Sequence, residues 1–138
     1  MRILIFCSLF LLALPTAQAQ TTSDALLEEF FTKYALDTDT GFDYLFGTNR
    51  WMGADNEGVN NVKSRIKNLL GLVGNYIGYE VISEKALGES LKKVVVVVKY
   101  ERQPLRFNFE LYKPDKTWII FNFSFNEELF EMLEDGGQ

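Results

Sequence analysis

The sequence predicts an α+β domain in which helices come first and a four-stranded antiparallel meander follows. Apolar residues recur at helical spacing over residues 24–35 and 59–73, and after Asn75 the spacing changes to that of extended strands. Helices grouped before an antiparallel sheet are typical of the α+β class. Residues 20–138 suffice for one hydrophobic core, so we expect a single domain.

Two amphipathic helices account for the first half of the pattern. The first, over residues 24–35, has Ser23 as its expected N-cap. The second, over residues 59–73, carries its apolar side chains on one stripe and ends at Gly74. Residues 37–58 between them are rich in Asp, Asn, Thr and Gly but also hold aromatic residues. We therefore expect a long ordered connection there, with a short helical turn around Phe42 to Phe46.

The strands are expected at residues 76–84, 92–102, 105–112 and 117–125. Pro114 occupies the favoured second position of the turn between the last two strands. Asn126 is expected to cap a short C-terminal helix, with Leu129, Phe130 and Leu133 facing inward.

Two of the strands are apolar on both faces. Residues 94–98 are five consecutive valines, whereas a strand with one wet face should alternate with polar residues. In the fourth strand we place Ile119, Phe121, Phe123 and Phe125 on one face, and Trp118 and Ile120 on the other. One sheet face must take the helices. The second would line a ligand pocket, form a dimer interface or lie beneath the C-terminal helix.

The N-terminus has the pattern of a cleavable signal peptide over residues 1–19. Arg2 precedes an apolar run, and Ala17 and Ala19 supply the small residues before a cleavage site at Gln20. The run is too short for a permanent membrane anchor. We therefore expect a periplasmic or extracellular protein. Because Cys7 lies inside the run, lipid attachment is not expected, and cleavage would remove the only thiol.

Composition excludes several kinds of chemistry. The sequence contains no histidine, and residues 20–138 contain no cysteine, which removes His-containing triads, thiol nucleophiles and the usual zinc ligands. Without Arg2, 14 − 1 = 13 basic residues face 19 acidic ones, a net charge of −6 that argues against a nucleic-acid partner. A calcium loop counted from Asp37 fails, because its sixth and twelfth positions hold Phe42 and Thr48. We predict no metal and no cofactor.

Polar side chains in the third strand form the candidate site. Arg106, Asn108, Glu110 and Tyr112 alternate with apolar residues and so share one face. If this face lines a cavity, we expect Arg106, Asn108 and Glu110, with Trp118, to bind a ligand. Glu110, Tyr112 or Asp43 would be the acid/base group of an enzyme. The competing interpretation is a cross-strand salt bridge to Lys99 or Glu101.

Residues 100–107 (YERQPLRF) and 111–118 (LYKPDKTW), together with the order of elements, resemble the nuclear-transport-factor-2-like superfamily, the cystatin-like α+β roll, in its small exported bacterial branch. The resemblance covers most of residues 24–133. It implies a curved sheet around a helical hairpin, a cone-shaped pocket, and frequent dimerisation through the sheet. Enzymes of similar fold place Asp, His or Tyr in the pocket. No position here matches those residues, so no catalytic residue is carried over.

Three functional hypotheses follow. The leading one is an exported, non-enzymatic domain that binds an apolar small molecule or a protein partner. The first alternative is a pocket enzyme of the SnoaL-like or ketosteroid isomerase-like type. The second is a cystatin-like inhibitor or interaction module, which needs a protruding hairpin.

Overall fold

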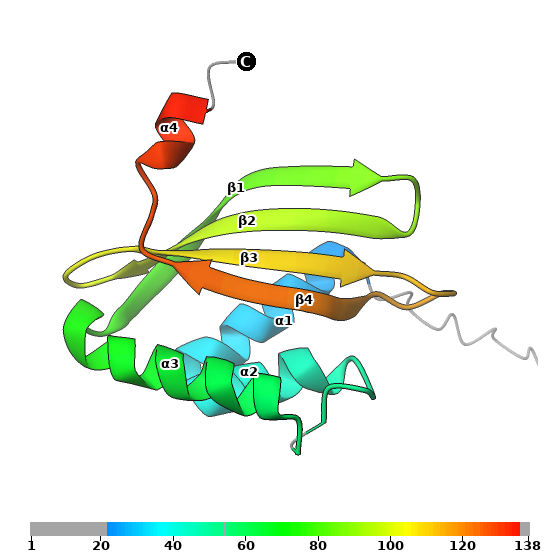
Figure 1. Cartoon of the computed structure of the whole chain (residues 1–138), viewed down its shortest axis with the longest axis horizontal. Coiled ribbons are helices and arrows are strands. Elements are labelled where there is room, and N and C mark those ends of the chain that lie inside the picture. The colour runs from blue at the N-terminus through cyan, green and yellow to red at the C-terminus, as the bar shows by residue number, and fades with distance from the viewer. Residues whose placement is uncertain (1–21, 54, 136–138) are drawn as a thin grey trace, which may run out of the picture.

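The computed structural model describes residues 22–53 and 55–135, so the predicted signal peptide with Cys7 lies outside the described residues. It has the predicted α+β architecture (Figure 1). The elements are α1 (Ser23–Leu36), α2 (Thr38–Gly47), α3 (Glu57–Val73), β1 (Tyr76–Leu87), β2 (Leu91–Tyr100), β3 (Leu105–Tyr112), β4 (Ile119–Asn126) and α4 (Glu131–Asp135).

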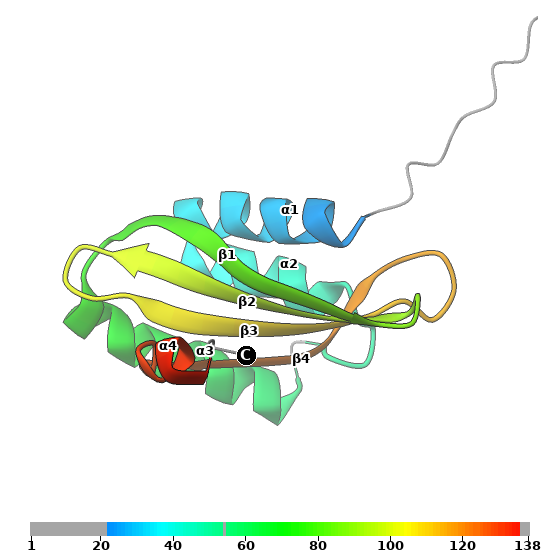
Figure 2. The ribbon, with the colours of Figure 1, turned by 90° about the horizontal axis from the view of Figure 1, so that it is seen from above.

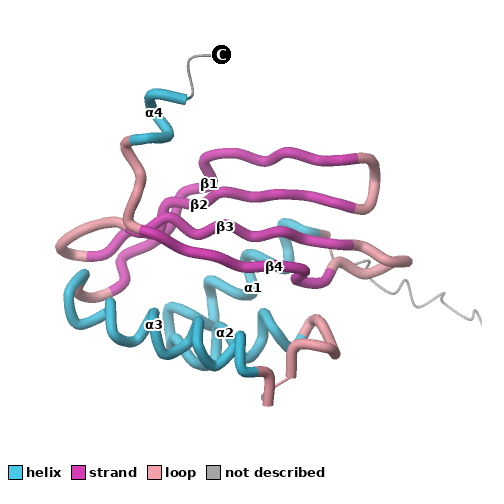
Figure 3. The backbone as a smooth tube through the Cα atoms, viewed as in Figure 1, coloured by secondary structure: helices cyan, strands magenta, loops and turns pink. Residues whose placement is uncertain are grey.

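The sheet is an antiparallel meander in the order β1-β2-β3-β4. Helices α1, α2 and α3 lie on one side of it, and α4 stands off on the other (Figures 1 and 2). We call the side that faces α1–α3 the inner face and the other the outer face. The β1–β2 and β3–β4 turns lie at one end of the sheet, which we call the hairpin end (Figure 3). α3 leads into β1 at the opposite end.

The first helix begins one residue earlier than predicted. Its N-cap is Thr22, whose hydroxyl accepts from the Ala25 amide at 3.1 Å. Ser23, the expected cap, is instead buried inside the first turn, where its hydroxyl accepts from Lys92 Nζ at 2.7 Å. A residue of β2 therefore fixes the start of α1 on the sheet.

The expected connection over residues 37–58 contains a full helix, α2, of ten residues. Asp37 caps it and accepts from the Thr40 amide at 2.8 Å and the Thr40 hydroxyl at 2.9 Å, which lowers the pKa of Asp37. Gly41 then allows α2 to lie against α1, because a Cβ at this position would be 2.8 Å from the Tyr34 Cα. The stretch is helical because Asp37 caps it and because it packs against α1. Neither cause appears in the sequence as a periodic spacing of apolar residues.

Aromatic rings fill the space between the inner face and the helices. Phe30 and Phe31 of α1 meet Phe109 of β3, with centroids 5.4 and 5.9 Å away. Phe42 of α2 lies 5.3 Å from Phe123 of β4. The family resemblance implies a cone-shaped pocket between the sheet and the helices. Here the protein's own aromatic side chains occupy that space.

A buried tyrosine pair joins α1 to β2. The hydroxyls of Tyr34 and Tyr100 are 2.5 Å apart. Burial is the main cause that raises the pKa of both, and burial together with the neighbouring Tyr79 and Tyr34 raises the pKa of Tyr76 to about 12. All three groups are therefore held in the neutral form.

The fourth strand does not alternate as predicted. Leu111 pairs with Ile120, but Glu110 pairs with Asn122, so one extra residue, Phe121, bulges from β4. Ile120 therefore shares the inner face with Phe123 and Phe125, whereas Phe121 is exposed. Placing Ile119 and Phe121 with the buried phenylalanines was wrong, since the bulge shifts the register by one residue.

Two side chains at the end of α2 bind the backbone of β4. Thr48 Oγ1 accepts from the Ile120 amide at 3.0 Å, and Asn49 Nδ2 donates to the Ile120 carbonyl at 2.8 Å. Both backbone groups of this residue are thus satisfied by side chains. The contact attaches the α2–α3 connection to the sheet edge.

The C-terminal helix is short, as expected, but its apolar residues do not face inward. Phe130 is 81% and Leu133 75% exposed, while Leu129 is half-buried. The prediction failed because α4 begins only at Glu131, and residues 127–130 carry the chain away from the core.

We expect Gly41→Ala to destabilise the fold by about 1–3 kcal/mol, because the new methyl group overlaps α1. Gly71→Ala in α3 is the matched control, since nothing lies within 4 Å of the added Cβ. It should stabilise by up to about 1 kcal/mol through helix propensity. Urea unfolding of both variants measures the difference, and a neutral Gly41→Ala would contradict the close packing of α1 on α2.

Tyr34→Phe should lower the free energy of unfolding by about 1–3 kcal/mol, because the buried Tyr100 hydroxyl loses its partner. The double variant, Tyr34→Phe with Tyr100→Phe, should lower it less.

The raised pKa values of the tyrosines add a pH dependence to the stability. Unfolded tyrosine ionises near pH 10, so stability is complete below about pH 10 and falls as the pH rises above it, by up to about 1.4 kcal/mol per pH unit for each tyrosine held neutral. Urea unfolding at pH 8, 10 and 11 should show this fall, and it should be smaller in the double variant. An equal fall in both proteins would contradict the assignment.

Candidate functional site

The predicted polar row lies on the outer face of the sheet. Arg106 Nε donates to Asn108 Oδ1 at 3.0 Å, and Asn108 Nδ2 donates to Ser124 Oγ at 3.2 Å. Glu110 accepts from Asn122 Nδ2 at 3.2 Å. The row therefore forms two separate hydrogen-bonded groups across β3 and β4. Arg106, Asn108 and Glu110 are partly or fully buried, whereas Tyr112, the fourth residue of the row, is exposed.

The cross-strand salt bridges that we considered for this row take other partners. Lys99 Nζ lies 3.5 Å from Glu80 Oε1 of β1. Glu101 accepts from the Asn75 amide at 3.0 Å, which lowers the pKa of Glu101. Among the described residues, neither Lys99 nor Glu101 thus forms a salt bridge to the row, and Arg106 hydrogen-bonds Asn108 instead.

Apolar side chains gather on the outer face at the hairpin end. Leu87 of β1, Leu91 of β2, Tyr112 of β3 and Phe121 of β4 are 74%, 38%, 37% and 55% exposed. The rings of Tyr112 and Phe121 make an edge contact at 6.4 Å. No helix of the described residues lies over this group (Figure 1).

A hollow of about 310 Å³ opens beside Leu87, Leu91 and Phe121. We call it the hairpin hollow; it is lined by Lys85, Ala86, Leu87, Leu91, Lys92, Lys93, Glu110, Leu111 and Phe121. Lys93 and Glu110 stand opposite each other in the β2–β3 register. The hollow thus combines an apolar lining with both signs of charge.

The valine run beside the hollow is partly covered without any helix. Val95 is 4% exposed, although it points to the outer face. It pairs with Ser83 and Asn108, and the next outer residue, Val97, pairs with Glu80 and Arg106. Polar side chains of the adjacent strands thus flank both outer valines, and α4 stands away from the sheet (Figure 1).

Trp118 lies apart from the other predicted ligand-binding residues. Lys92 and Lys113 place their ammonium groups 5.6 and 5.2 Å from the centre of its ring. Together with Thr22, Ser23 and Asp24 at the start of α1, these residues line a separate hollow of about 290 Å³. The predicted set of four residues is thus divided between two places.

The three acid/base candidates are also divided. Asp43 is on α2, where it forms an ion pair with Lys63 of α3 at 2.5 Å. Glu110 and Tyr112 are on the outer face, on the other side of the sheet from α2. The fold brings Glu110 near Tyr112 and keeps Asp43 away from both.

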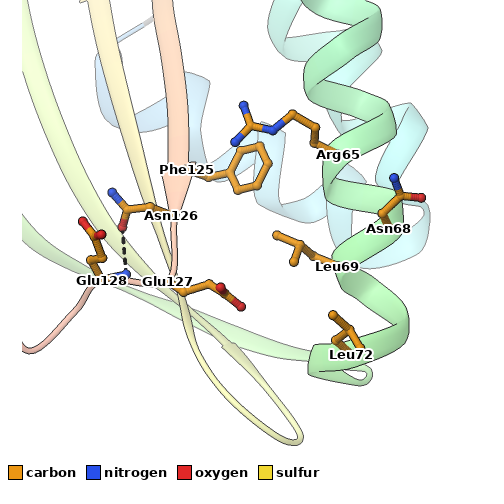
Figure 4. Close-up of a pocket in the computed structure, with 8 residues that line it drawn as sticks. All are labelled: Arg65, Asn68, Leu69, Leu72, Phe125, Asn126, Glu127 and Glu128. Atoms are coloured by element: carbon orange, nitrogen blue, oxygen red, sulfur yellow. Dashed lines mark hydrogen bonds between the residues drawn. The ribbon is translucent and has the colours of Figure 1, made fainter.

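A larger hollow lies between α3 and the end of β4. The only sequence pattern that touches this place is the apolar stripe of α3. This α3–β4 groove has a volume of about 470 Å³ and is lined by Arg65, Asn68, Leu69, Leu72, Phe125, Asn126, Glu127 and Glu128 (Figure 4). The Arg65 guanidinium lies 4.9 Å from the centre of the Phe125 ring. Across the groove, Glu127 accepts from Gln103 Nε2 at 2.8 Å.

Two further findings bear on the chemistry of the described residues. They contain no cluster of three or more Asp, Glu, His or Cys side chains that could hold a metal ion. Within the same part of the chain, no helix is both long enough and apolar enough to cross a bilayer.

Comparison with known proteins gives no relative from which a function could be transferred. No family model, no curated protein and no solved structure matches this chain.

Proposed function

We propose that this chain is an exported binding domain that docks a partner protein through the outer face of its sheet. The observation that carries the proposal is the group Leu87, Leu91, Tyr112 and Phe121. Leu87, Leu91 and Phe121 line one hollow, Tyr112 touches the Phe121 ring beside it, and all four stay exposed on a face without a covering helix. Contiguous apolar surface of this kind is typical of interaction sites.

The shape of the hollow favours a protein over an enclosed small molecule. Sites for small molecules usually surround most of the ligand. The hairpin hollow is open, and the aromatic rings on the inner face occupy the place where a cone-shaped pocket would be. A partner that inserted one apolar side chain between Leu91 and Phe121 would gain roughly 1.5–3 kcal/mol from that burial.

The charges at the hollow suggest what should surround the inserted side chain. Lys85 and Lys93 project on the outer face beside the apolar lining, and Glu110 stands across from Lys93. Carboxylates beside the apolar anchor would be attracted to the two lysines. The preferred partner surface is therefore apolar at its centre and acidic on the side that meets Lys85.

The superfamily resemblance remains a proposal of the same kind. It is supported by the order of elements, with three helices followed by a four-strand meander, and by the turn that joins Tyr112 to the last strand. Export rests on the pattern of residues 1–19. If both hold, a sheet-face contact with a second copy is one form that the partner could take.

The interaction-module alternative also has support. All residues from Glu84 to Leu91 are exposed, so the β1–β2 hairpin presents its tip to solvent, with Leu87 beside Gly88. Gly88 adopts a φ of +62°, which favours glycine. In this alternative the hairpin tip enters a cleft of the partner, and Leu87 matters more than Phe121.

A photo-crosslinking experiment tests the docking face. A benzophenone amino acid at position 121 should give a discrete cross-linked species in the producing cell, whereas the same group at Leu36, exposed at the end of α1, should not. The mass of the species distinguishes a second copy from another protein. Equal cross-linking at both positions, or none at 121, would contradict the proposal.

Phe121→Lys should remove the cross-link formed from a benzophenone group at position 91, because it places a charge in the apolar lining. Since Phe121 is 55% exposed, the substitution should leave the free energy of unfolding within about 0.5 kcal/mol of the parent. Leu87→Lys is the comparison variant. A loss with Leu87→Lys and none with Phe121→Lys would favour the hairpin-tip alternative.

A further inference from the structure

The C-terminal helix exposes two large apolar side chains. Phe130 and Leu133 are 81% and 75% exposed and are three residues apart, so they can share one side of a helical segment. A five-residue helix has too few hydrogen bonds to be stable in water without tertiary contacts. The segment therefore needs a surface to pack against.

The α3–β4 groove offers that surface close by in the chain. Leu69 and Phe125 form its floor, and Leu72, on its α3 bank, is 64% exposed. Glu127 and Glu128 line the groove themselves, and Leu129 follows them directly (Figure 4). Residues 127–130 follow the last residue of β4 and span up to about 14 Å when extended, so rotation of the chain at residues 127–129 can turn Phe130 toward the α3 bank.

We propose that the α3–β4 groove is the docking surface for the chain's own C-terminal segment, residues 129–135. In the structure α4 stands on the other side of the sheet with Phe130 and Leu133 exposed. In the docked conformation these two side chains pack on Leu69 and Leu72 of the same molecule, and the segment closes the groove as a strap. This inference concerns a different surface from the outer-face docking site and does not depend on it.

The α3 side of the groove has one basic side chain, Arg65, that complements the acidic segment. Glu131 and Glu134 are exposed on α4. On the α3 side, Arg65 stands over the Phe125 ring. Arg102 of the β2–β3 loop, which does not line the groove, donates to the Gly71 carbonyl of α3 at 3.2 Å. On the near side the carboxylate of Glu127 is held by Gln103, and Glu128 donates its amide to Asn126 Oδ1. Docking on the α3 side thus brings the carboxylates of α4 toward the Arg65 guanidinium and away from Glu127 and Glu128 on the β4 side.

Chain connectivity decides whether the segment that docks in the groove comes from the same molecule or from a second copy. A short flexible connection gives the attached segment an effective concentration in the millimolar range. The segment of another molecule has only its bulk concentration. The segment of the same molecule therefore outcompetes that of a second copy, and we assign the groove to the segment in cis.

Disulfide capture tests the contact, because the chain has a single cysteine that can be removed. In the Cys7→Ser background, Leu72→Cys with Leu133→Cys should form an intramolecular disulfide under mild oxidation at least tenfold faster than Leu87→Cys with Leu133→Cys. Leu87 is 74% exposed and lies at the hairpin end, so the control pair has comparable thiol accessibility. The two rates should become similar in concentrated urea.

Equal rates of the two pairs under native conditions would overturn the proposal. So would a Leu72–Leu133 disulfide that joins two molecules, since it would show docking in trans. A faster Leu87–Leu133 pair would also overturn it and would place α4 at the hairpin hollow.

Hydrogen exchange gives a readout that needs no cysteine. Phe130→Ser with Leu133→Ser should increase the exchange rates of amides in residues 65–72 severalfold, because the strap no longer shields the last turns of α3. Leu36→Ser is the matched control at an exposed leucine on α1 and should leave those rates unchanged. Unchanged rates in the double variant would overturn the contact.

Discussion

The packing of aromatic rings between the sheet and α1–α3 is the interaction on which the fold depends. Phe107 of β3 lies 5.2 Å from Phe123 of β4, and Phe109 lies 5.4 Å from Phe30 of α1. The only cysteine of the chain is Cys7, so residues 22–135 have no disulfide to hold them together. The same rings that hold the helices on the sheet also occupy its inner face, so the hairpin hollow and the α3–β4 groove both lie outside this aromatic core.

The sequence was sufficient to predict an element wherever a single spacing of apolar residues runs through the whole helix or strand. The boundaries of β3 were predicted to the residue, because Leu105 to Tyr112 alternates without interruption. The stretch that became α2 has no such period. It is helical because Asp37 caps it and because Gly41 permits contact with Tyr34, and both conditions depend on where α1 lies. A tertiary requirement of this kind cannot be read from spacing.

The candidate site was predictable only in part for a similar reason. Alternation in β3 places Arg106, Asn108 and Glu110 on one face, and the structure shows them there. The bulge at Phe121 has no sequence signal, yet it brings that ring to the outer face and forms one side of the hairpin hollow. Trp118 and Asp43 were chosen for their chemistry, and the fold places them elsewhere. The groove of Figure 4 depends on how far α3 stands from β4, which local sequence does not determine.

The attachment of Thr48 and Asn49 to Ile120 makes the two edges of the sheet unequal. At β4, side chains already occupy the amide and carbonyl of Ile120, so an incoming strand would have to displace them there. β1, at the other edge, is twelve residues long and exposes Ile77, Val81 and Ile82. Its bulges near Gly78 and Ile82 interrupt the straight run of backbone groups that a new strand would need. Growth of the sheet into a fibre is thus opposed by side chains at one edge and by backbone irregularity at the other.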